Sequence, residues 1–197
     1  MMNRIYRSSA RGSAAVEFLF CLPLLLLLAF PVFDLARVFQ ANMILTNMAR
    51  EGANLASRTL HAEQTIMDSL AATAPPLDMR ANGAIRITKI LATRQGGILR
   101  NVVIAQYRWQ NGSYDPPRGV WTCGAAGTYW SSDGSCAGLP PPASAPTIAI
   151  MSGALAEGDV VFLVETFYRF PLFFRRLQLG GYNAPDLDPD LYAMAIF

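Results

Sequence analysis

Residues 11–33 read RGSAAVEFLFCLPLLLLLAFPVF, and this stretch decides how the rest of the chain is organised. After Arg11 it holds a single charged residue, Glu17, at the start of the apolar run. At a helical rise of about 1.5 Å per residue, residues 13–33 span roughly 31 Å, which is close to the hydrocarbon thickness of a bilayer. The stretch therefore predicts a transmembrane segment over residues 13–33.

Composition limits the rest of the chain to one modest domain. Of the 197 residues, 52% are hydrophobic and only 15% are charged, and no second run approaches spanning length. The net charge of +2 is small and the basic residues are scattered, which argues against a nucleic-acid partner. One membrane anchor followed by one folded domain fits the length.

The charges beside the apolar run predict its orientation. Arg4, Arg7 and Arg11 precede it, and the first sixteen residues contain no acid. By the positive-inside rule, the N-terminus stays in the cytoplasm and everything after residue 33 lies on the outer side of the membrane.

The three cysteines agree with export. Cys21 lies in the membrane run, whereas Cys123 and Cys136 share a loop rich in glycine, serine and tryptophan in the exported part. Oxidation is permitted there, so we expect a disulfide that contributes about 3 kcal/mol. Two free thiols are the alternative, and metal binding by two cysteines without nearby histidines is less favoured.

Residues 34–74 predict an amphipathic spine helix that continues from the membrane segment. Apolar residues recur at intervals of three and seven, and proline is absent until Pro75. We expect a weak point near Gly52, and residues 59–73 either extend this helix or form a second one. The apolar stripe consists of Leu35, Val38, Leu45, Met48 and Leu55.

Residues 77–197 predict an exported β-rich domain. Residues 85–93 and 98–110 flank Arg-Gln-Gly-Gly and indicate a hairpin, in which Val103, Ala105, Tyr107 and Trp109 share a largely apolar face. Residues 111–146 predict a long surface excursion, and residues 159–170 and 190–197 predict two more strands. The expected fold is α+β, a long helix packed on a small antiparallel sheet of about four strands.

The residues around the apolar run resemble a known family. GSAAVEF followed by leucines is similar to the processing site of type IV pilins, and the longer pattern with AREGAN at residues 49–54 resembles the TadE-like minor pseudopilins of tight-adherence (Tad) pili. The resemblance implies that residues 1–12 are a prepilin leader, cut between Gly12 and Ser13. Glu17 then becomes the fifth mature residue, followed by Phe18.

The resemblance also implies a role in assembly. A new ammonium group at Ser13 and the Glu17 carboxylate of a neighbouring subunit would neutralise each other in a low-dielectric bundle and set the register between subunits. The alternative is an uncleaved anchor in which Glu17 marks the membrane edge and its carboxylate reaches water. The implied partners are a prepilin peptidase, the major pilin, other minor pseudopilins and the inner-membrane assembly platform. The implied location is the inner membrane of a bacterium, with the exported domain in the periplasm or outside the cell. Membrane lipid is the partner that the apolar run itself predicts.

Two functional hypotheses follow. The first is a minor pseudopilin that is required for assembling Tad pili in adhesion and biofilm formation. The second is an uncleaved, single-pass protein that presents its β domain to an extracellular ligand. An exported enzyme is a weak third reading, because the region after Phe33 lacks a signal-peptide cleavage pattern.

Little in the sequence indicates catalysis or a cofactor. Asp186, Asp188 and Asp190 imitate the start of a calcium loop, but the later glycine and glutamate of that template are missing, so acidic turn residues are preferred. His61, the only histidine, lies in a polar context on an expected helix and has no nucleophile motif beside it. We therefore expect neither an enzyme nor a resident metal. Trp109, Trp121 and Trp130 are expected to pack locally rather than form a sticky surface for a partner or a carbohydrate.

Overall fold

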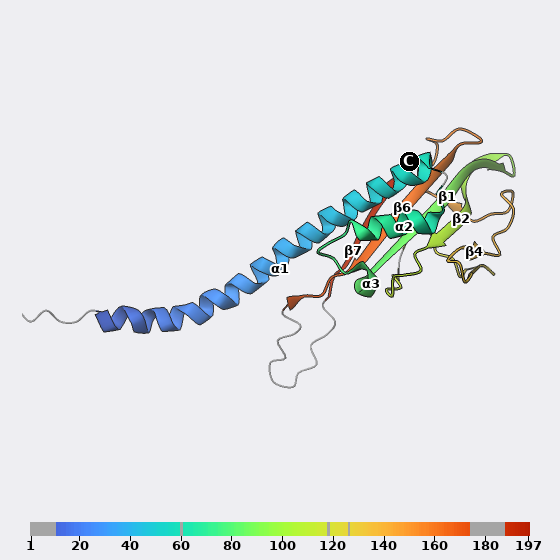
Figure 1. The fold of residues 1–197 in the computed structure, drawn as a ribbon. Coiled ribbons are helices and arrows are strands. Elements are labelled where there is room, and N and C mark those ends of the chain that lie inside the picture. Colours follow the sequence, from blue (N-terminus) through green and yellow to red (C-terminus); the bar gives the residue numbers. More distant parts are fainter. Residues whose placement is uncertain (1–10, 60, 118, 126, 174–187) are drawn as a thin grey trace, which may run out of the picture. The chain divides into compact units, whose positions relative to one another are not determined.

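The computed structural model describes residues 11–59, 61–117, 119–125, 127–173 and 188–197. The chain divides into two compact units, one of residues 1–38 with 172–187 and one of residues 39–171 with 188–197. The leader predicted over residues 1–12 lies almost wholly outside the described residues. The expected α+β class is confirmed, because a long N-terminal helix is followed by an antiparallel sheet (Figure 1).

The long helix α1 covers Arg11–Arg58 and contains both Pro23 and Pro31. A second helix, α2 (Glu63–Ala72), begins after Ala62, whose extended backbone forms its N-cap, and α3 (Met79–Asn82) is a single turn. The predicted spine of residues 34–74 therefore consists of two helices, which is the second of the two arrangements expected for residues 59–73. His61 lies in the connection between them, not on a helix, and it is exposed.

Gly52 does not weaken α1, which is continuous through it. A Cβ atom placed there would lie 2.6 Å from Leu70 Cδ1 of α2 and 3.0 Å from Val164 Cγ1 of the sheet. Both distances are shorter than ordinary van der Waals contact, so glycine allows α1 to approach its neighbours closely. The residue that looked like a helix breaker is a packing residue.

The main sheet has five strands in the order β5-β2-β1-β6-β7, with every neighbouring pair antiparallel. The predicted hairpin is confirmed, since Gly96 and Gly97 both have positive φ and join its strands in a two-residue turn. The sheet strands are β1 (Gly83–Gln95), β2 (Ile98–Arg108), β5 (Thr147–Ile148), β6 (Val160–Arg169) and β7 (Asp190–Ile196). The short β5 is the strand that the sequence analysis did not predict.

One face of this sheet, here called the helix face, is covered by residues 39–58 of α1 and by α2 (Figure 1). Thr166 Oγ1 of β6 donates a hydrogen bond of 3.1 Å to the carbonyl oxygen of Leu45 in α1. Lys89 of β1 pairs with Glu63 of α2 at 2.6 Å. The side of α1 that meets the sheet is fully or almost fully buried at Ala41, Leu45, Met48, Ala49, Ala53 and Ala56.

The opposite face, here called the loop face, is covered by the segment of residues 111–150. Val120, Trp121 and Leu139 pack against a buried cluster formed by Ile90, Val103, Ile148 and Leu163. The expected surface excursion is thus a second layer of the domain. It contains the small antiparallel pair β3 (Tyr129–Trp130) and β4 (Cys136–Ala137).

A β-bulge corrects one detail of the predicted hairpin. The register between β1 and β2 shifts between Lys89 and Ile90, so Lys89 pairs with Ala105 but Ile90 pairs with Val103. Because a one-residue shift moves a side chain to the other face, Val103 lies on the loop face and not beside Ala105.

Candidate functional site

The first half of α1 exposes an apolar surface along its length. The exposed large apolar side chains between Val16 and Phe33 keep between 38% and 76% of their surface accessible. An apolar surface of this extent marks a site of membrane or protein interaction. Within the part of the chain that the structure describes, α1 is the one helix long and apolar enough to cross a membrane.

The four residues predicted for processing and assembly all lie near the start of this helix. Gly12 and Ser13 belong to its first turn, and Glu17 and Phe18 follow one turn later. Glu17 is exposed, and Phe18 is 60% exposed. Cleavage after Gly12 stays a prediction, as does the assembly role of Glu17.

Asp34 marks the end of the apolar run and was not singled out from the sequence. Its side chain is buried and accepts hydrogen bonds from the backbone N–H of Phe173, with distances of 3.0 and 3.3 Å to its two oxygens. Arg37 lies 3.5 Å from the same carboxylate, and the rings of Phe30 and Phe173 stack at 5.6 Å. Its position as the first acid after the apolar run could have singled out Asp34 in the sequence. Its partner could not be predicted, because Phe173 lies 139 residues away.

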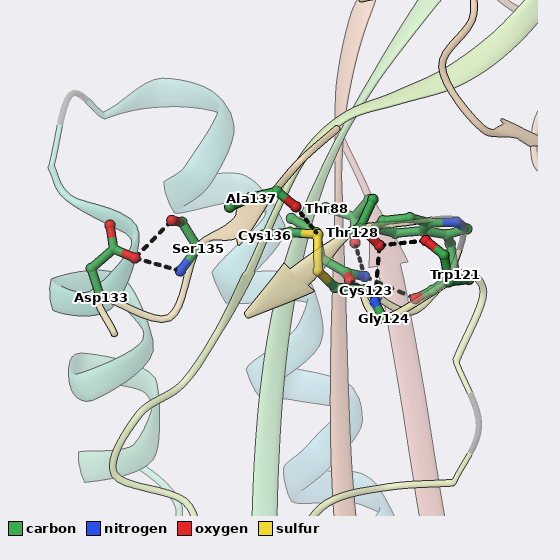
Figure 2. The surroundings of a disulfide bond; sticks show 11 residues. Thr88, Trp121, Cys123, Gly124, Thr128, Asp133, Ser135, Cys136 and Ala137 are labelled. Atoms are coloured by element: carbon green, nitrogen blue, oxygen red, sulfur yellow. Dashed lines mark hydrogen bonds between the residues drawn. A yellow bond between two sulfur atoms is a disulfide. The ribbon is translucent and has the colours of Figure 1, made fainter. Parts of the chain in front are cut away.

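Cys123 and Cys136 form a disulfide that fastens β4 to the preceding loop (Figure 2). The backbone N–H of Cys123 donates to Oε1 of Gln106 in β2 at 2.9 Å, and Gly124 N–H donates to Thr128 Oγ1 at 2.9 Å. Cys123 is almost fully buried. The bond therefore belongs to the layer that covers the loop face. Cys21 is a free, exposed thiol on α1.

Polar side chains of the sheet hold the covering segment in place. Arg86 of β1 donates to Thr122 Oγ1 at 2.9 Å and to the Pro116 carbonyl at 3.2 Å. Glu165 of β6 is the direct partner of Arg86 in the register, and its Oε1 accepts from Val120 N–H at 2.8 Å. This buried layer is therefore held by hydrogen bonds as well as by apolar packing.

Burial shifts the pKa values of this layer. It raises the pKa of the Glu165 carboxyl, even though hydrogen bonds from Val120 and Tyr192 favour the charged form. Oε2 of Glu165 is buried and has no hydrogen-bond partner among the described residues. Burial also lowers the pKa of Arg86, against the opposing charges of Glu165 and Asp115.

Among the residues that the structure describes, the remaining candidates do not gather into a reactive site. Asp190 Oδ1 accepts a hydrogen bond of 2.7 Å from the Tyr114 hydroxyl, and Asp186 lies outside the described residues. Burial and this contact raise the pKa of Tyr114 to about 12. No group of three potential metal-ligating side chains occurs among the residues that the structure places.

The tryptophans pack locally, as expected. Trp109 is 5% exposed and its indole N–H donates to Asp68 Oδ1 at 2.8 Å. Trp121 packs on the loop-face cluster, and the guanidinium of Arg108 lies 5.2 Å above the ring of Trp130.

Comparison with known proteins finds a family match in the N-terminal helix. Residues 12–54 match the family model described as TadE-like protein. The match begins at Gly12 and ends four residues before α1 does, so it covers the exposed and the packed halves of the helix and none of the sheet. Searches of the curated proteins and of the solved structures found no significant match. Over residues 12–54, the chain is therefore similar to the TadE-like family, as its sequence pattern indicated.

Proposed function

We propose that this protein is a minor pseudopilin of a Tad pilus, processed by a prepilin peptidase and required for assembling pili that act in surface adhesion and biofilm formation. The observation that carries the proposal is the overlap of the TadE-like match with a helix whose apolar side chains are exposed. The leader and the order of residues from Gly12 to Phe18 support it further.

The physical argument concerns what covers this helix. Before assembly, lipid covers the apolar side chains, and the N-terminus is held in the cytoplasm by its arginines. During assembly, helices of the major pilin and of other minor pseudopilins take the place of lipid. Glu17 then pairs with a terminal ammonium group at Ser13, which lowers the cost of burying both charges. The inner-membrane platform is the proposed place of this exchange.

The experiment compares two glutamates of α1, Glu17 and Glu51, both of which are exposed. In a strain with the complete pilus system, we expect Glu17→Ala to keep its membrane location and lose piliation. Glu51→Ala serves as the matched control and should retain pili. Normal piliation in Glu17→Ala, with surface attachment unchanged, contradicts the proposal and favours the uncleaved anchored binding protein.

A further inference from the structure

A polar cavity of about 330 Å³ lies in the sheet domain. Arg86 of β1, Arg108 of β2 and Asp115 of the covering segment line it, together with Ser131 and Ser132. The volume suits a molecule of monosaccharide size.

The sheet register places two positive charges together at this cavity. Arg86 and Arg108 are direct partners in the antiparallel pair of β1 and β2, so their side chains leave the same face. Like charges directly opposite one another destabilise a strand pair. An anion that binds between or beside the two guanidinium groups would offset this repulsion.

The described acids compensate these charges only in part. Arg86 lies opposite the buried Glu165 carboxyl in β6, and within 4.0 Å it has one carboxylate partner in the described part of the chain, Asp115 at 3.4 Å, whose side chain is 92% exposed. Arg108 has no carboxylate within that distance among the described residues and contacts the Trp130 ring instead. The Arg86 side chain, in contrast, is only 3% exposed.

The cavity also offers hydroxyl groups. The side chains of Ser131 and Ser132 make no hydrogen bond within the described part of the structure, so both hydroxyls are available to a ligand. Guanidinium groups bind carboxylates through paired, charge-assisted hydrogen bonds, and hydroxyl groups suit a hydroxylated ligand.

We propose that this cavity binds a small hydroxylated carboxylate, of the class of sugar acids, whose carboxylate displaces Asp115 from Arg86 and contacts Arg108. Asp115 then acts as an internal competitor that occupies Arg86 in the empty cavity. The proposal concerns the exported domain and does not depend on processing or on pilus assembly.

The test is calorimetric titration of the full chain in detergent with glucuronate, with neutral glucose as the matched probe. We expect glucuronate to bind and glucose to bind at least tenfold more weakly. Arg108→Gln should weaken glucuronate binding about tenfold or more, because it removes one charge-assisted contact. Arg94→Gln, which changes an exposed arginine paired with Glu157, should leave binding unchanged.

Asp115→Asn distinguishes a ligand site from a structural cluster, because it removes the competitor. We expect this variant to bind glucuronate more tightly than the unchanged chain does. Arg86→Gln should abolish glucuronate binding. If this substitution of a buried residue prevents folding, the exposed Arg108→Gln variant still tests the proposal. No binding of glucuronate at 10 mM, or equal binding of glucose, overturns the proposal. If glucose 6-phosphate and inorganic phosphate each bind as tightly as glucuronate does, the assignment of the cavity to carboxylates is overturned.

Discussion

The two halves of α1 have the same backbone structure and opposite surroundings. In the first half, Leu25 is 58% exposed and Phe20 is 76% exposed, whereas in the second half Leu45 and Ala49 are fully buried under the protein's own sheet. The second half is completed by folding of one chain. The first half needs a further apolar partner, either lipid or neighbouring helices. Substitutions of the same kind in the two halves should therefore have different effects.

The largest difference is expected for leucine. Leu45→Ala removes a fully buried side chain and should cost the sheet domain about 2–5 kcal/mol of unfolding free energy. Leu25→Ala is the matched change in the exposed half and should cost less than about 0.5 kcal/mol in detergent. Urea unfolding followed by tryptophan fluorescence measures the difference, since all three tryptophans lie beyond residue 100. Equal losses would contradict the division of the helix.

Cysteine gives the next comparison. Replacing Cys123 and Cys136 together by serine opens a link with a sequence separation of 13 and should lower domain stability by about 3 kcal/mol in the chain-entropy model. Cys21→Ser, on the exposed half of α1, should leave domain stability unchanged. Thermal unfolding of both variants under oxidising conditions checks this result. A reducing agent should lower the stability of the unchanged chain to that of the double variant. If it does not, the disulfide is not the source of the difference in stability.

Small residues on α1 give a smaller difference. Gly52→Val places atoms against Leu70 and Val164 and should cost about 1–3 kcal/mol through overpacking. Ala29→Val enlarges an exposed small residue of the first half and should not change unfolding of the sheet domain. Guanidinium denaturation measures the unfolding free energy of both variants. A stabilised Gly52→Val would show that helix propensity outweighs close packing at this contact.

The smallest expected effect is a change of slope with pH. Because burial raises the folded-state pKa of Glu165 above its usual value of 4.5, the folded chain binds more protons than the unfolded chain between that pH and the folded-state pKa. The contribution of Glu165 to stability is therefore largest at low pH and decreases as pH rises through the folded-state pKa.

Glu165→Gln should remove this decrease while keeping an oxygen acceptor for Val120 and Tyr192. Unfolding free energies measured from pH 4.5 to 8 should thus show a flatter profile for Glu165→Gln than for the unchanged chain. Parallel profiles for the two chains would mean that Glu165 does not titrate differently in the folded domain.

The sequence was sufficient for features that depend on local pattern. The apolar run, the stripe that includes Leu45, the glycine turn of the hairpin and the alternation of β6 each carry their structure in a few neighbouring residues. Asp34 and its contact with Phe173 were missed because the partner is 139 residues away. The bulge beside Lys89 was missed because a register shift depends on the neighbouring strand and not on one strand's own alternation.

The covering layer was misjudged for a physical reason. Residues 111–146 are rich in proline and glycine, which is typical of surface loops. In the structure they are held by polar side chains of the sheet, among them Arg86, Gln106 and Glu165. A polar sheet face can be buried when each group finds a partner, and the sequence does not show those partners.

The measurement that tests the central claim most directly is the intact mass of the membrane-extracted protein from cells that contain the prepilin peptidase. The account predicts a chain that begins at Ser13, and a Gly12→Val variant that retains residues 1–12. A stable full-length chain that begins at residue 1 in the same cells would contradict it.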